Sequence, residues 1–318
     1  MGSVLVRRAA ALLGEARRVV VFTGAGISAE SGVPTFRDDL TGLWARFDAQ
    51  RLATPEAFHA DPDLVWGWYE WRRRRVRRAE PNPGHLATAA IEARVADSVV
   101  ITQNVDDLHE RAGSAAPIHL HGSLFAPRCV TAAAHPAILQ ETPDSDAPGS
   151  DAPNGEAAEL IAGTELATGT ELATGTELTT GQRIPPPRCA SCGALVRPGV
   201  VWFGEALPEA ALVAAVDAAA ACDVLLTVGT SGVVYPAAEV PRIAARRGAT
   251  VIQVNPEPTP LDGICAINLR GTASQILPAL VAGAWDPTGD GTMGTAGDGT
   301  AGAAGNRVTR TAGDRTTS

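Results

Sequence analysis

Residues 19–28 read Val-Val-Val-Phe-Thr-Gly-Ala-Gly-Ile-Ser, a β-branched and aromatic run followed directly by a glycine-rich turn. The run predicts a buried strand over 19–23, and Gly24 and Gly26 would let a ligand approach the backbone closely. A helix that begins here would point free N–H groups at a phosphate. The usual dinucleotide fingerprint has a third glycine where this chain has Ala29, and Gly-x-Gly after a strand is often only a tight turn. The stretch alone is therefore a weak sign of a nucleotide site.

Four further short runs rich in Val and Ile are typical of strands, and helix-like or turn-forming sequence separates most of them. They cover residues 98–102, 118–120, 224–228 and 250–254, and an amphipathic helix is predicted over 4–18. Strands that read as continuous apolar runs belong to parallel sheets covered on both faces. We therefore expect an α/β fold with a doubly wound, Rossmann-like parallel sheet. A ligand is expected beyond the carboxyl ends of the strands.

The segment between residues 43 and 79 differs in composition, being rich in Trp, Phe, Tyr and Arg without a strand pattern. We expect a helical module here, inserted between early elements of the sheet. Its arginine run, from Arg72 to Arg78, is typical of a solvated helix face.

The overall composition excludes several classes of protein. The chain has 318 residues, 45% of them hydrophobic, and a net charge of −9, which argues against a basic nucleic-acid surface. No run of eighteen apolar residues could span a membrane, and the apolar run over 9–14 is too short for a secretory signal. We expect a cytoplasmic protein that binds neither nucleic acid nor membrane. Because the chain contains no Lys, it cannot itself carry a lysine modification.

Two segments are of low complexity. Residues 140–187 contain the hexapeptide Gly-Thr-Glu-Leu-Ala-Thr from Gly163 and Gly169, with a variant copy from Gly175. Three copies are too few to bury the core of a β-helix, so a flexible insertion is predicted. Residues 286–318 have almost no large apolar side chain, which predicts a disordered tail.

Four blocks of sequence together carry a family resemblance. They are residues 24–38, Gln103-Asn104-Val105-Asp106, His119-Leu120-His121-Gly122 and Val201-Trp202-Phe203-Gly204-Glu205. In this order they resemble the sirtuins, the NAD-dependent protein deacylases, over about residues 1–284. The resemblance implies NAD as the cofactor and acyl-lysine proteins or peptides as partners. The NAD-binding positions that it implies are Gly24, Ala25, Gly26, Ile27, Ser28, Thr35, Phe36, Arg37, Gln103, Asn104, Val105, Asp106, Gly229, Thr230, Ser231, Asn255, Pro256, Glu257 and Ala273.

The same resemblance assigns the catalytic roles. His121 corresponds to the general base, although a lone His before Gly-Ser is by itself more often structural. In the family reaction the acyl oxygen attacks C1′ of the nicotinamide ribose and nicotinamide leaves. The histidine then takes a proton from a ribose hydroxyl, and the products are nicotinamide, O-acyl-ADP-ribose and free lysine. An ordinary imidazole pKa near ~6.5 suits that step.

Roles in ligand binding are expected for other polar residues. Asn104 and Asp106 would hold the nicotinamide amide, whereas His109 and His119 are given no role. Asn255 would contact a ribose hydroxyl, although Asn-Pro after a strand is also an ordinary turn former.

Residues 201–205 are expected to contact the substrate. By resemblance, Val201, Trp202, Phe203, Gly204 and Glu205 pair with the acylated peptide as a β-strand, through backbone hydrogen bonds that are largely blind to sequence. The alternative is an ordinary core strand that ends at Gly204.

Tyr69 and Arg72 bear on the acyl group, because residues three apart share one helix face. The pair matches the Tyr-x-x-Arg of the sirtuin subgroup that removes succinyl, malonyl and glutaryl groups. A guanidinium and a phenol can both donate hydrogen bonds to a carboxylate. Ala53 occupies the position where this subgroup has a small residue. We therefore predict removal of succinyl and malonyl groups, and acetyl only weakly. A plain deacetylase, an ADP-ribosyltransferase and a non-catalytic NAD-binding scaffold are the alternatives.

The cysteines indicate an incomplete metal site. Structural zinc commonly takes two Cys-x-x-Cys pairs, and Cys189 and Cys192 form one of them. Cys129 could open the other pair, but position 132 is Ala132, and His135 is a potential substitute ligand. An odd count of five cysteines argues against a disulfide framework. The sequence leaves zinc binding open.

These features predict the following domain organisation. The Rossmann-like NAD-binding domain comprises residues 1–38, 80–123 and 201–284. A helical acyl-pocket module covers 39–79, and a zinc-type module covers 124–200. The sequence predicts neither the natural substrate proteins nor the oligomeric state.

Overall fold

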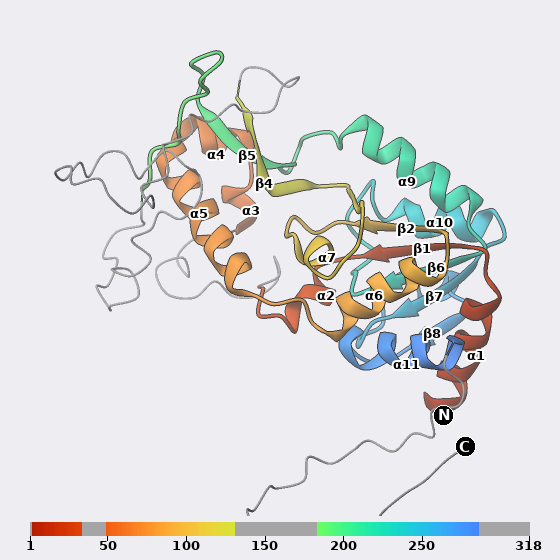
Figure 1. The fold of residues 1–318 in the computed structure, drawn as a ribbon. Helices are drawn as coiled ribbons and strands as arrows, with labels where there is room; N and C mark the ends of the chain where they lie inside the picture. The colour runs from red at the N-terminus through yellow and green to blue at the C-terminus, as the bar shows by residue number, and fades with distance from the viewer. Residues whose placement is uncertain (1, 34–48, 131–182, 286–318) are drawn as a thin grey trace, which may run out of the picture. The chain divides into compact units, whose positions relative to one another are not determined.

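The computed structural model describes residues 2–33, 49–130 and 183–285. Its largest element is a six-stranded sheet with the strand order β3-β2-β1-β6-β7-β8, in which every neighbouring pair is parallel (Figure 1). The strands are β1 (Arg18–Thr23), β2 (Asp97–Thr102), β3 (Ile118–His119), β6 (Val224–Val228), β7 (Thr250–Val254) and β8 (Ile267–Leu269). The strand order reverses between β1 and β6, so their carboxyl ends border the switch point where doubly wound sheets bind ligands. The predicted fold class is confirmed.

Helices cover both faces of the sheet because the residues of β1 alternate between two cores. Val19 and Val21 pack with α1 (Gly2–Glu15), α6 (Pro83–Arg94) and α11 (Ala273–Trp285). Val20 and Phe22 pack with α9 (Glu209–Ala221) and α10 (Glu239–Arg246). Both faces of the strand are therefore buried, which explains its continuous apolar sequence.

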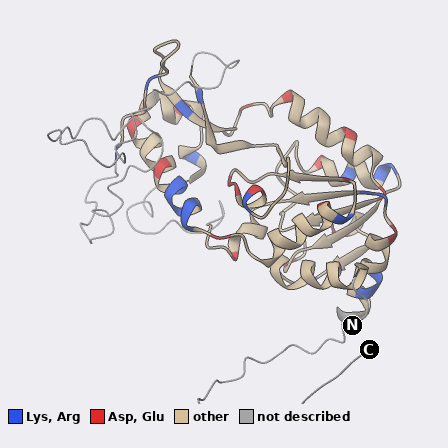
Figure 2. Cartoon of the chain, viewed as in Figure 1, with Lys and Arg blue, Asp and Glu red and all other residues tan. Residues whose placement is uncertain are grey.

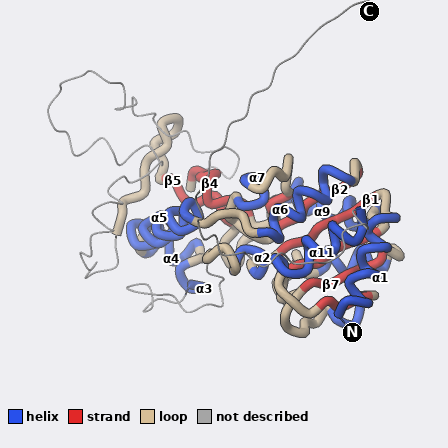
Figure 3. Tube along the Cα trace, turned by 60° about the horizontal axis from the view of Figure 1, so that its bottom comes forward, coloured by secondary structure: helices blue, strands red, loops and turns tan. Residues whose placement is uncertain are grey.

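A second group of elements lies beyond the carboxyl edge of the sheet (Figures 1 and 3). It contains α3 (Ala49–Leu52), α4 (Pro55–Ala60) and α5 (Pro62–Arg78), the helical structure expected in this segment. An antiparallel pair, β4 (Gly122–Cys129) and β5 (Val196–Val200), packs against α5. Thr54 and Asp61 cap α4 and α5 through their side-chain oxygens, and each helix begins with Pro.

The arginine run of α5 is not wholly a solvated face, which corrects that prediction. Figure 2 shows blue arginine positions along α5. Arg72 and Arg73 are 7% and 3% exposed, whereas Arg75 and Arg78 are exposed. Arg73 pairs with Glu70 and donates to the carbonyl of Leu124 over 2.7 Å. The run therefore divides into a buried half, which packs against β4, and an exposed half.

The predicted insertion lies mainly, and the predicted tail wholly, outside the described residues. The last part of the insertion, residues 183–187, is described and packs against the helical group. Ile184 is buried and donates to the carbonyl of Asp63 over 2.9 Å, and Arg183 pairs with Asp61. The low-complexity pattern therefore overestimates the length of the insertion at this end. Among the described helices, none combines the length and apolar character that a membrane span requires.

Candidate active site

Two glycine turns meet at the switch point of the sheet. Gly24 and Gly26 follow β1, Gly229 follows β6 with φ +58°, and the amide of Gly26 donates to the carbonyl of Gly229 over 2.8 Å. A Cβ at Gly26 would lie 2.7 Å from that carbonyl oxygen, and one at Gly229 would lie 2.5 Å from the nitrogen of Ile27. Only glycine allows the two turns to approach so closely, at the edge where doubly wound sheets bind dinucleotides.

The element after the first turn is shorter than the predicted helix. Residues Gly26–Ala29 form the single turn α2, in which the amides of Ile27 and Ser28 donate to the carbonyls of Gly24 and Ala25. The N–H groups expected to face a phosphate are therefore engaged within the turn itself.

Side chains of the loop after β2 form hydrogen bonds across this switch point. Gln103 donates to the hydroxyl of Thr230 over 2.9 Å, and Asn104 donates to that of Ser28 over 3.0 Å. The structure thus joins three of the predicted NAD-binding segments, which lie far apart in the sequence, by hydrogen bonds.

Asp106, on the same loop, is 5% exposed. Burial raises the pKa of its carboxyl group, opposed by hydrogen bonds from the amide of Leu108 and the hydroxyl of Ser28. A carboxyl group on this loop offers hydrogen-bonding oxygens to an amide ligand.

His121 follows β3 and faces the same loop. Its Nδ1 lies 2.9 Å from the carbonyl oxygen of Gln103, which can only accept, so Nδ1 carries the proton. In a neutral ring Nε2 is then unprotonated and able to take a proton. Burial lowers the pKa of His121, opposed by the hydrogen bond to Gln103. The neutral base is therefore the prevailing form at pH 7.

Two buried histidines beneath the turn were missed by the sequence reasoning. The Nε2 of His85 lies 3.3 Å from the hydroxyl of Ser28, and the Nε2 of His109 lies 3.0 Å from that of Thr23. Burial lowers the pKa of His85 to about 4 and that of His109 to about 3. Their rings meet edge to face at 5.1 Å. Both rings are neutral and support the site. The sequence signal for His85 is the capping box that places this residue at the start of α6.

His119 also has a structural role that the sequence did not suggest. Its Nδ1 lies 3.0 Å from the carbonyl of Asn104, and its Nε2 lies 2.8 Å from Glu110. Two imidazoles therefore hold consecutive carbonyls of the loop after β2: His121 binds that of Gln103, and His119 binds that of Asn104.

The residues predicted to select the acyl group lie together in the core of the helical group. Ala53, Trp68, Tyr69 and Trp202 share one apolar cluster and are all at most 3% exposed. The indole nitrogen of Trp202 donates to the hydroxyl of Tyr69 over 3.0 Å. Burial raises the pKa of Tyr69 to about 12, opposed by the charge of Arg72 and this hydrogen bond.

Arg72 is buried beside Tyr69 on α5. Its guanidinium lies over the ring of Trp68 at 5.2 Å. Burial lowers the pKa of Arg72, and electrostatic interactions with Tyr69 and Asp106 oppose that shift. The predicted acyl-selecting arginine thus lies within electrostatic range of the predicted nicotinamide-binding carboxyl group.

Residues 201–205 form a turn rather than a strand, which corrects the alternative of a core strand that ends at Gly204. Strand β5 ends at Val200, and Gly204 has φ +86°, a conformation that strands exclude. The amide of Glu205 turns back to the carbonyl of Trp202, while that of Phe203 donates to the carbonyl of Ala53. Pairing of this segment with a peptide remains a prediction.

The remaining described positions expected to bind NAD lie after β6 and β7 and at the start of α11. The side chain of Asn255 donates to the carbonyl of Glu257 over 2.8 Å, so in this structure it stabilises its own turn beside Pro256. Ala273 is 4% exposed in the core at the start of α11, and Ser231 follows Thr230 after β6. Thr35, Phe36, Arg37 and His135 lie outside the described residues.

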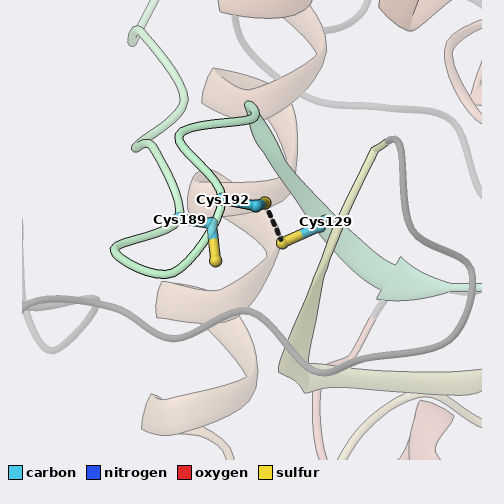
Figure 4. Close-up of side chains that lie close together, drawn as sticks. All are labelled: Cys129, Cys189 and Cys192. Carbon is cyan, nitrogen blue, oxygen red and sulfur yellow. Dashed lines mark hydrogen bonds between the residues drawn. The ribbon is translucent and has the colours of Figure 1, made fainter.

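Three cysteines form a separate cluster at the end of β4 (Figure 4). The sulfur atoms of Cys129, Cys189 and Cys192 lie within 4.8 Å of one another, and the first two are buried. Burial and the two neighbouring thiols raise the pKa of Cys129 to about 12. A bound cation would reverse that shift, because a coordinated thiol is deprotonated. The donor set and spacing fit zinc, for which the described residues supply three thiolate ligands.

Comparison with known proteins agrees with this arrangement. The model of the "Sir2 family" matches residues 24–236. An "NAD-dependent protein deacylase" of Methylococcus capsulatus is 54% identical over 271 residues, covering 85% of this chain and 94% of the relative. An "NAD-dependent protein deacylase 1" of Pseudomonas aeruginosa is 52% identical over 280 residues, covering 88% and 99%. A solved Sir2 homologue–NAD complex has a TM-score of 0.70 at 40% identity, covering 88% of this chain and 94% of that one. The chain belongs to the Sir2 family.

Proposed function

We propose that this Sir2-family enzyme is an NAD-dependent protein deacylase that removes succinyl and malonyl groups from lysine in preference to acetyl groups. The observation that carries the proposal is a set of contacts made by three consecutive residues. The amide of Val201 donates to the carbonyl of His121 over 2.8 Å, and that of Phe203 donates to the carbonyl of Ala53 over 2.9 Å. Between them, the indole of Trp202 donates to Tyr69. One short segment thus joins the catalytic base to the residues that would select the acyl group.

The reaction needs a proton acceptor beside the cofactor. When bound, NAD would supply an electrophilic ribose carbon for the acyl oxygen, with nicotinamide as the leaving group. Nε2 of His121 is the unprotonated nitrogen and would take the proton of a ribose hydroxyl. Asn104 and Asp106 lie on the loop that His121 holds, and they would bind the nicotinamide amide.

The acyl group is selected by charge. A succinyl or malonyl group ends in a carboxylate, which loses hydration when it enters a buried site. Arg72 is a buried cation there, and the protonated Tyr69 is a second donor. An acetyl group makes neither contact, so the interaction favours acidic acyl groups over acetyl.

A peptide panel tests the proposal. One peptide sequence carrying acetyl-, malonyl- or succinyl-lysine is incubated with NAD, and the products are followed by mass. We expect O-acyl-ADP-ribose and nicotinamide in equal amounts, and a higher kcat/KM for the two acidic acyl groups. An equal or higher kcat/KM for the acetyl peptide would indicate that the enzyme is a plain deacetylase. Nicotinamide release without any acyl peptide would instead favour an ADP-ribosyltransferase.

A further inference from the structure

A buried hydrogen bond joins two elements that flank the acyl-selecting residues. The indole N–H of Trp202, in the turn after β5, donates to the hydroxyl oxygen of Tyr69 on α5 over 3.0 Å. The two side chains are 2% and 1% exposed, so water does not compete for this bond. Trp202 is therefore a fixed partner of the tyrosine.

A donor at the phenolic oxygen restricts the direction of the phenolic hydrogen. A tyrosine hydroxyl can accept from one group and donate to another, and its hydrogen lies close to the ring plane on one of two sides. The N–H of Trp202 occupies one of those sides, so the hydrogen must lie on the other. Because burial raises the pKa of Tyr69 to about 12, the hydroxyl keeps that hydrogen at neutral pH.

The indole is itself held by two further contacts. The guanidinium carbon of Arg197 lies 3.3 Å from the centre of the Trp202 ring, and the ring of Phe58 lies 5.4 Å from it. Glu205 accepts from the backbone amide of Trp202 over 2.8 Å and from Arg197 over 2.9 Å. Rotating the indole away from Tyr69 would disrupt its contacts with Arg197 and Phe58, so the hydrogen bond is preorganised.

Glu205 is suited to hold this arrangement as an anion. Burial opposes its ionisation, but the hydrogen bonds from Arg197 and the Trp202 amide, with the charges of Arg197 and Arg128, outweigh it and lower its pKa. Arg128 reaches Glu205 over 3.1 Å. The two arginines and one carboxylate thus fix the turn from which the indole projects.

We propose that Trp202 is a positioning residue for acyl selectivity: its indole N–H sets the hydroxyl of Tyr69 to donate to the carboxylate of an acidic acyl group, beside Arg72. The assignment rests on the proposed function. The indole of Trp202 acts through Tyr69, whereas the expected pairing of residues 201–205 with the peptide uses the backbone, which a side-chain substitution keeps. Loss of the indole N–H should therefore weaken the reaction of succinyl-lysine more than that of acetyl-lysine.

The test compares Trp202→Phe, Tyr69→Phe and the double variant on succinyl- and acetyl-lysine peptides of one sequence. Trp202→Phe keeps an aromatic ring between Arg197 and Phe58 but removes the N–H. Trp285→Phe, on α11, is the control for the loss of an indole elsewhere. A second variant places benzothienylalanine at position 202, which keeps the bicyclic shape and replaces N–H by sulfur, so a folding defect of the phenylalanine variant does not decide the outcome.

The expected result is a rise in KM for the succinyl peptide of about threefold to tenfold, the loss of one buried hydrogen bond. The succinyl-to-acetyl ratio of kcat/KM should fall by about the same factor, and the double variant should be no worse than Tyr69→Phe alone. Equal losses on both peptides, or additive losses in the double variant, would overturn the positioning role. Failure of the proposed function would differ, because the unaltered enzyme would then show no preference for the succinyl peptide.

Discussion

Nδ1 of His121 donates to the carbonyl oxygen of Gln103 over 2.9 Å, and this bond leaves Nε2 as the basic nitrogen. Burial lowers the pKa of His121 below the ordinary 6.5. Protonation at acid pH removes the base, so kcat/KM should fall with an acidic limb whose midpoint lies below pH 6.5. His121→Ala should lower kcat by ~10²–10⁴-fold. The control is the exposed His59 on α4, since His59→Gln should change neither the limb nor the rate. A midpoint above 6.5, or a largely active His121→Ala variant, would contradict this role.

The two histidines beneath the glycine turn should make folding sensitive to acid. Both are neutral in the folded chain, with pKa values of about 4 for His85 and about 3 for His109, whereas the unfolded chain protonates them near 6.5. As pH falls from 6.5, the unfolded state binds more protons, so the free energy of unfolding decreases until the folded-state pKa values are reached.

Together the pair should lower the free energy of unfolding by about 2 kcal/mol between pH 6.5 and 5.5, beyond the change from other groups. Urea unfolding at several pH values measures this slope. His109→Gln should reduce the slope whatever its effect on absolute stability. An unchanged slope in that variant would show that His109 titrates normally in the folded chain.

The contact between the two glycine turns predicts a steric effect. Gly26→Ala places a Cβ 2.7 Å from the carbonyl oxygen of Gly229, so one backbone must move. The variant should lose about 1–3 kcal/mol of stability and bind NAD more weakly. Gly263→Ala is the matched control, because a Cβ there meets no atom within 4 Å. Thermal unfolding and NAD titration by calorimetry would check both effects, and wild-type values for Gly26→Ala would refute the close contact.

The cysteine cluster predicts a structural metal. Elemental analysis of the purified chain should find roughly one zinc ion per molecule, held by Cys129, Cys189 and Cys192. Cys189→Ser should lose the metal and unfold at a lower temperature, whereas Cys265→Ser, outside the cluster, should retain it. A chelator should lower the unfolding temperature of the wild-type chain but not that of Cys189→Ser. Equal zinc in both variants would place the metal elsewhere.

The sequence predicts the central sheet well because its strands are buried on both faces. The runs over 224–228 and 250–254 coincide with β6 and β7. Strands β4 and β5 escape prediction because they contain Pro, Gly and Arg and neither alternate nor run apolar. They form because each finds the other across a long stretch of chain, which local pattern does not encode.

The candidate site also contains residues that the sequence predicts and contacts that it does not predict. Motif resemblance predicts roles for His121, Asn104 and Tyr69. In the structure these residues form hydrogen bonds with Gln103, Ser28 and Trp202, and their roles in the reaction stay predictions. The contacts of His85, His109 and Trp202 join residues 57, 86 and 133 positions apart, so local sequence does not reveal the partners, although the capping box of α6 marks the position of His85. The resemblance predicts that residues 201–205 pair as a strand, but the positive φ of Gly204 ends the extended conformation.

Acyl selectivity is tested most directly by Arg72→Met, measured as the ratio of kcat/KM for succinyl- and acetyl-lysine peptides. Arg72 is buried beside Tyr69, whereas Arg75, one turn further along α5, is exposed over the ring of Trp71 and supplies the control Arg75→Met. Loss of the buried guanidinium should remove about 2–5 kcal/mol of discrimination, through the succinyl peptide alone. Arg75→Met should keep the wild-type ratio. If Arg72→Met instead lowers kcat/KM for both peptides by the same factor, Arg72 does not recognise the acyl carboxylate.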